Sequence, residues 1–327
     1  MTPHSEEHVI EEWVKVRGSK ILVRRQGNGE PVLLINGVGS HTGMWRPIEC
    51  CWHNRQVISF DAPGVGRSPH RIVPPSIKEI SDVALGVLDH LGIKQCDVLG
   101  YSLGGTVAQT LALHQPQRVR RLVLAATSPG VGLVPGKWSS VFHLYNPMRY
   151  YSKLYYEKTI GPMAGGQARN DPTFIERHGH LRRMHRPNVL GYYMQMAAIS
   201  SFSSLRWLRD IEVPTLVVTG DDDPLIPPVN SYLLARRIPE ARLLVSPGDG
   251  HLILFDSRSP ALAKIHDFLD ARDLADSTTW GAALDVTEEE EEAALSRTVA
   301  GSFPLSMCHS GYRWLADHPY RGEPSQF

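Results

Sequence analysis

The sequence predicts an α/β fold in which a mostly parallel central sheet is flanked by helices and carries an inserted helical cap. Short continuous apolar runs recur along the chain, as expected for strands covered on both faces. They alternate with segments of helical spacing, which implies parallel strands joined by right-handed crossovers. The alternation breaks once, over residues 128–210, where frequent Gly, Pro, Met and aromatic residues predict the insertion.

Composition fits one large core with such an insertion. The chain has 327 residues, of which 42% are hydrophobic and 21% charged, and its formal net charge is zero. Residues 133–210 hold eleven Lys/Arg against four Asp/Glu, whereas residues 273–327 hold three against ten. A solvated face is the simplest interpretation of the basic segment, and attraction to the acidic tail or to an anionic surface is the alternative.

We divide the chain into a first core part at 1–127, a cap at 128–210, a second core part at 211–271 and an acidic, flexible tail at 272–327. The four cysteines form no C-x-x-C pair, which favours reduced thiols in a cytoplasm. The first residues lack a secretion pattern, and no apolar run approaches membrane-spanning length. We therefore expect a cytoplasmic protein without a transmembrane segment or a nucleic-acid partner.

The first core part begins with strands. Residues 11–17 and 21–25 alternate in polarity around a Gly-Ser turn, which predicts an antiparallel hairpin at a sheet edge. Apolar runs at 31–35 and 57–60 predict buried strands, each followed by a loop rich in turn residues. The loop at 61–68 lacks the spacing of a phosphate-binding loop, so no nucleotide cofactor is indicated.

A helix is predicted next, over residues 77–91. Apolar residues recur there at helical spacing, and Ser76 with Glu79 forms a capping-box pattern at its start. Gly92 is a typical stop signal. We expect this helix to pack on the sheet.

A nucleophile elbow is predicted at Ser102. The serine stands in G-x-S-x-G, between an apolar run at 96–99 and a helical segment at 106–114. Glycines on both sides let the backbone turn sharply from strand to helix, which exposes the hydroxyl at a helix N-terminus. Because the pattern alone also occurs in ordinary loops, the prediction depends on partners elsewhere in the chain.

Regular alternation continues after the elbow and resumes after the cap. An apolar run at 119–126 predicts the strand that precedes the cap. Behind the cap, strands are expected at 214–219 and 241–246, and helices at 229–238 and 260–269. Beyond residue 271 no usable periodicity remains, which is the basis for the flexible tail.

Three carboxylates follow the strand at 214–219, where a catalytic acid is required. We choose Asp223, because Gly220, Asp223 and Pro227 give G-x-x-D-x-x-x-P spacing, and we expect Asp221 and Asp222 to cap or contact the loop. A calcium site is the alternative for such a cluster, but D-x-D-x-D-G spacing is absent.

The base is predicted to be His251. It follows the strand at 241–246 through a Pro-Gly-Asp-Gly turn that can bring an imidazole over the end of the sheet. Of the fifteen histidines, those on helical patterns, such as His90, His114 and His266, are better explained by packing or surface positions. Because H-E-x-x-H is absent, neither zinc nor another metal or cofactor is indicated.

Together these residues predict acyl transfer through a covalent intermediate. His251 would remove the proton of Ser102, which attacks a carbonyl carbon, while Asp223 fixes the imidazole tautomer. The backbone N–H groups of Leu103, just after the nucleophile, and Val38, in the loop after strand 31–35, would hold the developing oxyanion. Water would then release the acyl group.

With these residues in place, the chain resembles the α/β-hydrolase superfamily and, within it, the bacterial intracellular poly(3-hydroxyalkanoate) depolymerases that act on medium-chain polyesters. The resemblance covers residues 11–269. The motifs that carry it are N-G-V-G at 36–39, F-D-A-P-G-V-G at 60–66, residues 122–127, V-P-G-K at 134–137, G-Y-Y at 191–193, residues 220–227 and G-H-L at 250–252. The two cap motifs are the most discriminating. Where a Trp commonly follows the nucleophile in this family, Leu103 does here, a difference that concerns the substrate and not the triad.

The resemblance implies the α/β-hydrolase fold, a polyester of 3-hydroxy acids or a smaller acyl ester as substrate, and contact with a polyester granule. An aromatic, apolar cap suits an acyl chain of this kind. A carbon–carbon bond hydrolase or cofactor-free haloperoxidase with the same triad is the alternative enzyme, and a non-catalytic ligand-binding protein is the alternative from another class. Position 102 disfavours epoxide hydrolases and dehalogenases, which use a carboxylate, and polyester synthases, which use Cys.

Overall fold

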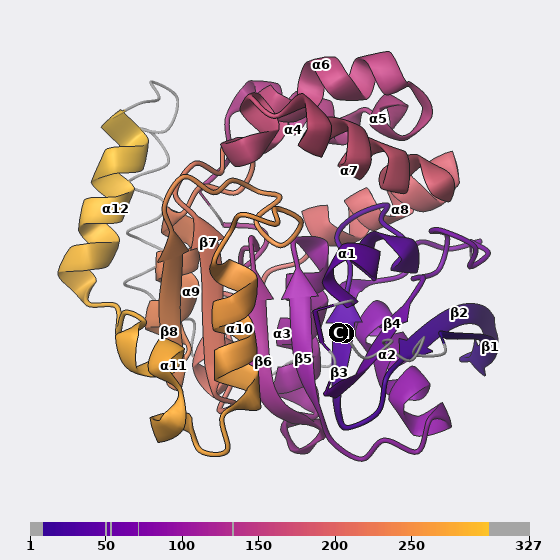
Figure 1. The fold of residues 1–327 in the computed structure, drawn as a ribbon, viewed down its shortest axis with the longest axis horizontal. Coiled ribbons are helices and arrows are strands. Elements are labelled where there is room, and N and C mark those ends of the chain that lie inside the picture. Colours follow the sequence, from indigo (N-terminus) through magenta and orange to yellow (C-terminus); the bar gives the residue numbers. More distant parts are fainter. Residues whose placement is uncertain (1–8, 50, 53, 71, 133, 301–327) are drawn as a thin grey trace, which may run out of the picture.

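The computed structural model describes residues 9–49, 51–52, 54–70, 72–132 and 134–300. These residues form an eight-stranded sheet of order β1-β2-β4-β3-β5-β6-β7-β8 (Figure 1). The β1/β2 and β2/β4 pairs are antiparallel and all other neighbours are parallel, so the predicted hairpin lies at one edge. The strands are β1 Ile10–Val16, β2 Ser19–Gln26, β3 Glu30–Ile35, β4 Arg55–Phe60, β5 Cys96–Tyr101, β6 Val119–Ala125, β7 Thr215–Gly220 and β8 Ala241–Ser246.

Helices cover both faces of this sheet. Side chains alternate along each strand, and the two sets belong to separate buried clusters, one with α2, α3 and α9 and the other with α1 and α10. The predicted capping box of α2 is present, with Ser76 and Glu79 each bonded to the other's backbone. The bounds are α1 Arg46–Glu49, α2 Ile77–His90, α3 Leu103–His114, α9 Val229–Arg237 and α10 Ala261–Asp270.

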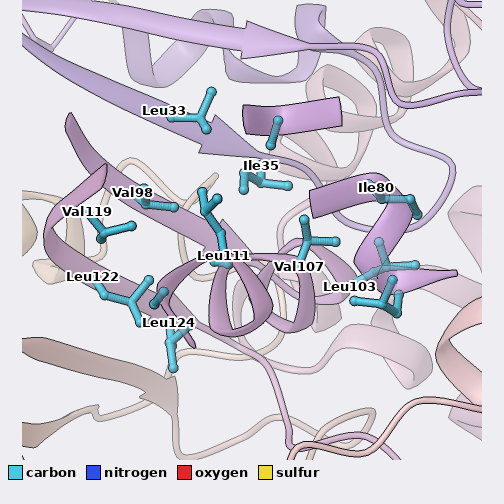
Figure 2. Close-up of a cluster of buried hydrophobic side chains, with 14 of the residues drawn as sticks. Leu33, Ile35, Ile80, Val98, Leu103, Val107, Leu111, Val119, Leu122 and Leu124 are labelled. Atoms are coloured by element: carbon cyan, nitrogen blue, oxygen red, sulfur yellow. The ribbon is translucent and has the colours of Figure 1, made fainter. Parts of the chain in front are cut away.

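The helix behind the elbow is anchored by one apolar face. Leu103, Val107 and Leu111 stand four residues apart in α3, so they lie on the same side of the helix. Figure 2 shows them within the cluster formed by side chains of β3, β5 and β6, and all three are fully or almost fully buried. This packing fixes the N-terminus of α3 against the ends of the central strands.

The segment for which a cap is predicted is helical. Five helices between β6 and β7 lie beyond the carboxyl ends of the parallel strands in the described residues (Figure 1). Their positions were not predictable from periodicity, because several of them bury only short stretches. They are α4 Trp138–Tyr145, α5 Met148–Tyr151, α6 Lys153–Ala164, α7 Pro172–Met184 and α8 Val189–Ser200.

Residues 272–300 differ from the expected flexible tail. They include helices α11 Thr278–Ala282 and α12 Glu288–Ala300, and α12 runs beside α9 (Figure 1). Leu295 is buried in the core, Leu284 pairs with Leu243 of β8, and Arg236 of α9 forms ion pairs with Glu288 and Glu291. These sparse contacts leave no periodic pattern in the sequence. The rest of the predicted tail, 301–327, lies outside the described residues.

Among the helices of the described residues, none combines the length and the apolar character that crossing a membrane requires.

Candidate active site

Ser102 occupies the sharp turn between β5 and α3. Its φ of 54° and ψ of −121° are unusual for a residue with a side chain, and such strain is typical of a nucleophile elbow. Two hydrogen bonds hold it there: its N–H donates to Ala125 O (3.0 Å), and Thr127 Oγ1 donates to its carbonyl (2.7 Å). The hydroxyl-bearing residue is partly exposed although its neighbours are buried.

One glycine of the elbow is required by a close approach. A Cβ at Gly104 would overlap the carbonyl oxygen of Ile35, the last residue of β3. The start of α3 therefore touches the end of β3 directly, which brings the loop after β3 next to Ser102. From the sequence, the glycines of the elbow were explained by the sharp turn alone and not by this contact.

His251 and Asp223 complete a row of hydrogen bonds with Ser102. The distance from His251 Nε2 to Ser102 Oγ is 3.2 Å, and from His251 Nδ1 to Asp223 Oδ2 it is 2.8 Å. The imidazole and carboxylate are almost completely buried, and Asp223 Oδ1 also accepts the N–H groups of Leu225 and Ile226. A carboxylate on Nδ1 favours the tautomer in which Nε2 accepts the serine proton.

The other two aspartates of the loop have different partners. Asp221 accepts the N–H of Gly248, and Asp222 accepts the N–H of Gly166 and both sides of the Arg169 guanidinium. The hydrogen bond from Arg169 lowers the pKa of Asp222. The three carboxylates thus do not converge, and the described residues hold no group of three or more His, Cys, Asp or Glu suited to a metal ion.

The two backbone N–H groups predicted to hold an oxyanion belong to segments that border Ser102. Leu103 begins α3, so its N–H has no acceptor four residues earlier within the helix. The carbonyl of Gly37 accepts from Ser40, and across the trans peptide the N–H of Val38 points the opposite way. A Cβ at Gly37 would lie 3.1 Å from Ser102 Cβ, which shows how closely this loop approaches the serine.

Comparison with known proteins agrees with this architecture. Residues 30–257 match the family described as alpha/beta hydrolase fold. The chain belongs to this family. The predicted fold class, with its mostly parallel sheet flanked by helices, is therefore confirmed.

The relatives of this α/β-hydrolase include enzymes with different named activities. A poly(3-hydroxyalkanoate) depolymerase of Ectopseudomonas oleovorans is 39% identical over 72% of this chain and 82% of its own. A 2-hydroxymuconate semialdehyde hydrolase of Pseudomonas sp. strain CF600 is 28% identical over 79% and 93%. The crystal structure of a hydrolase from Pseudomonas aeruginosa PA01 has a TM-score of 0.68 and 26% identity, and covers 80% of this chain and 98% of that one. The family and these relatives support hydrolase activity.

Two cap side chains hold the loop of the α/β-hydrolase that carries Val38. Tyr150 of α5 donates its hydroxyl to Val38 O (2.6 Å), and Gln195 of α8 accepts the N–H of Gly39 through Oε1 (2.8 Å). From the sequence, Tyr150 was included without distinction among the aromatic residues of segment 128–210, and Gln195 was not identified. The available signal was a lone amide in an otherwise apolar helix, because a buried amide requires a partner.

The histidine loop of the α/β-hydrolase is bonded to the cap as well. The backbone N–H of His251 donates to Ala164 O at the end of α6 (2.6 Å), while its carbonyl accepts the buried hydroxyl of Tyr101 (3.0 Å). Next to Ala164, Gly165 has a φ of 68°, and a Cβ there would overlap the carbonyl oxygen of Asp222. The cap, the acid loop and the histidine loop therefore meet through direct backbone contacts.

Replacing Gly165 by alanine is expected to lower the free energy of unfolding by about 2–4 kcal/mol, because positive-φ strain adds to overlap with backbone. Gly248→Ala is the matched control: its φ is 76°, but nothing lies within 4 Å of the added Cβ, so it should cost only about 1–2 kcal/mol. Urea denaturation measures both. Equal losses would mean that the contact with Asp222 contributes nothing to stability.

Proposed function

We propose that this protein is a serine hydrolase of carboxylic ester bonds, with Ser102 as nucleophile, His251 as base and Asp223 as the orienting acid. The observation that carries the proposal is the unbroken row of hydrogen bonds from Asp223 through His251 to a strained serine at a strand-to-helix turn. Fold membership alone would not identify the chemistry, whereas this arrangement has the geometry that proton transfer from a serine requires.

The reaction would proceed in two stages. His251 takes the hydroxyl proton as Ser102 attacks the ester carbonyl, and the N–H groups of Val38 and Leu103 stabilise the oxyanion. Collapse of the tetrahedral intermediate expels the alcohol, which receives the proton from His251, and leaves an acyl-enzyme. Water, deprotonated by the same imidazole, then releases the acid. Asp223 remains ionised and stabilises the imidazolium throughout.

The substrate we propose is a polyester of 3-hydroxyalkanoic acids or a short ester related to it. The support is the similarity to the named depolymerase together with an apolar cluster beside the histidine. Leu252, adjacent to His251, packs in this cluster with Ile160 and Met163 of α6. The space next to the imidazole is thus bordered by packed apolar side chains, which favour alkyl groups over polar ones.

The test is release of 3-hydroxy acids from amorphous medium-chain polyhydroxyalkanoate by the purified protein, beside short and medium p-nitrophenyl esters. Fluorophosphonate labelling, with Ser102→Ala as control, reports the nucleophile directly. We expect release and stoichiometric labelling that both depend on Ser102. Ester cleavage without polymer cleavage would retain the mechanism and exclude the polymer, and no labelling of a folded protein would favour a non-catalytic binder.

We also propose that the outer face of the cap contacts a polyester granule. Trp138 and Phe142 stand four residues apart on α4 and are 72% and 68% exposed, and the hydroxyl of Tyr193 bonds to the carbonyl of Tyr145 beside them. Burial of large apolar side chains against a polymer surface would stabilise attachment.

Replacing both Trp138 and Phe142 by serine should weaken attachment about 100-fold or more, because each side chain contributes about 1.5–3 kcal/mol when fully buried. Cosedimentation with amorphous polyester particles measures it, and hydrolysis of a soluble p-nitrophenyl ester should not change. The control is Ile72→Ser, which removes a 96% exposed apolar side chain from the loop between β4 and α2, outside the cap. Equal binding by the double variant would rule out this face.

A further inference from the structure

Two buried arginines of the cap lack a charged partner among the residues that the structure describes. Arg149 of α5 and Arg182 of α7, here called the cap arginines, are 3% and 5% exposed. Arg149 donates to Tyr192 Oη (2.9 Å) and lies near Met163 Sδ, whereas the guanidinium of Arg182 lies 4.8 Å above the ring of Tyr150. Within the described residues, Nε and Nη1 of Arg182 and Nε of Arg149 have no hydrogen-bond partner.

Of the other three buried arginines of the described residues, two have carboxylate partners. Arg24 is bonded to Glu49 and Arg55 to Asp97, each through charged hydrogen bonds of 3.1 Å or less. Arg121 donates to the backbone carbonyls at the end of α10. For the cap arginines the structure provides aromatic faces and a hydroxyl but no carboxylate. A buried charge without its counterion is costly, so an anion is the group that this place lacks.

The cap arginines lie next to the loop proposed to stabilise the oxyanion. Tyr150, whose ring Arg182 covers, donates to the carbonyl of Val38, and a Cβ at Gly39 would lie 2.7 Å from the Tyr150 hydroxyl and 2.8 Å from the Tyr192 ring. Burial raises the pKa of Tyr101, which precedes the nucleophile, and the charge of Arg182 is the strongest influence that opposes this rise. Through Tyr150, the guanidinium of Arg182 is therefore one side chain away from the loop that borders Ser102.

We infer that the cap arginines, Arg182 above all, bind the free carboxylate of the substrate, so that the enzyme prefers esters whose alcohol part carries an acid. This inference rests on the proposed ester hydrolysis at Ser102. A planar guanidinium with unpaired N–H groups binds a carboxylate more strongly than any neutral group of an ester. Because Nε and Nη1 of Arg182 have no hydrogen-bond partner in the described residues, binding a carboxylate there breaks no existing hydrogen bond of these groups.

The acid end of a 3-hydroxyalkanoate chain has this chemistry. Its last ester joins the chain to an alcohol carbon whose own carboxylate is two carbons away, a short distance from the reacting carbonyl. Attack by Ser102 breaks the bond between the acyl carbon and the alcohol oxygen, and His251 returns the serine proton to that oxygen. The leaving group is a 3-hydroxy acid monomer whose carboxylate the cap arginines hold, and water then releases the shortened chain from Ser102.

The test compares two substrates that differ only in charge: the linear dimer of 3-hydroxyoctanoic acid and its methyl ester, with cleavage of the internal ester followed by chromatography. Wild-type kcat/KM should be about 10- to 100-fold higher for the free acid, the range expected of charged hydrogen bonds. In Arg182→Gln this ratio should fall to about threefold or less, and Arg182→Lys should restore part of it. Arg177→Gln, the same charge change at an exposed site of α7, should leave the ratio unchanged.

A second measurement on the wild-type protein does not depend on the folding of any variant. The free acid 3-hydroxyoctanoate should inhibit hydrolysis of a neutral p-nitrophenyl ester at least tenfold more strongly than 3-hydroxyoctanamide, with competitive kinetics. Equal inhibition, or equal kcat/KM for the two dimers, would overturn the carboxylate site while leaving the proposed hydrolysis intact. Absence of any ester cleavage by the wild-type protein would instead contradict the proposed function itself.

Discussion

Replacing Ser102 by alanine is expected to lower kcat on a soluble p-nitrophenyl ester about 10⁵- to 10⁶-fold, while KM changes little. The hydroxyl is the atom that forms the acyl-enzyme in the proposed mechanism, so its loss removes the covalent route altogether. Any residual rate would come from the oxyanion-binding N–H groups and from substrate binding. Single-turnover and steady-state hydrolysis, followed by nitrophenolate release, measure the change.

The control for this variant is Ser128→Ala. Ser128 is buried, and its hydroxyl accepts a local hydrogen bond from the N–H of Gly130 at 3.3 Å. Its removal should change kcat less than about threefold, because it touches none of the reacting groups. If Ser102→Ala retained a tenth of the wild-type rate, with an unchanged circular dichroism spectrum, another residue would have to be the nucleophile.

Asp223→Asn should lower kcat about 10⁴-fold without unfolding the protein. The amide retains the size of the carboxylate but favours the wrong imidazole tautomer and leaves the imidazolium without its counter-charge, so His251 loses its power as a base. A pH-rate profile of kcat/KM on the same ester measures the loss. The carboxylate also accepts two backbone N–H groups, which is why the conservative asparagine is preferable to alanine.

The adjacent Asp222→Asn is the matched control for Asp223→Asn. It breaks the ion pair between Asp222 and Arg169. Because these side chains are 42% and 35% exposed, the pair is weak, and turnover should fall less than about tenfold. Because the folded-state pKa of Asp222 is lowered, its pair stabilises the protein above pH 3.8 and this stabilisation is lost as the pH falls further. The free energy of unfolding of Asp222→Asn should therefore lack this contribution to the decrease at low pH. Equal activity losses in both variants would contradict the assignment of Asp223.

The fold and the meeting of the three proposed catalytic side chains were predictable because each depends on a local pattern. Apolar runs mark the strands, and in a parallel sheet the residues just after each strand gather at one edge. Ser102, Asp223 and His251 all follow strands in this way, and G-x-S-x-G marks the turn. The G-x-x-D-x-x-x-P spacing then selected Asp223 from its two neighbours before any distance was known.

The supporting contacts were not predictable because they join segments far apart in the chain. Tyr150 reaches Val38 across 112 residues, and Gln195 reaches Gly39 across 156. Nothing local distinguishes either side chain from those that only pack. Arg182 was counted in the basic segment, for which a solvated face was the simplest interpretation, whereas it is buried. Helix α12 escaped notice since few of its side chains are buried.

The backbone contacts between Gly165, Asp222 and His251 also limit how the cap can be exchanged or engineered. If a cap from a relative replaced only the segment between the two junctions, it would pack against acid and histidine loops with which it did not evolve. The fit is close there, because even a Cβ added at Gly165 would overlap the carbonyl oxygen of Asp222. Such chimaeras should retain activity only when residues 164–166, 220–223 and 249–251 are transferred together. Cap diversity among relatives would then evolve in step with two short loops of the core, and not as an independent module.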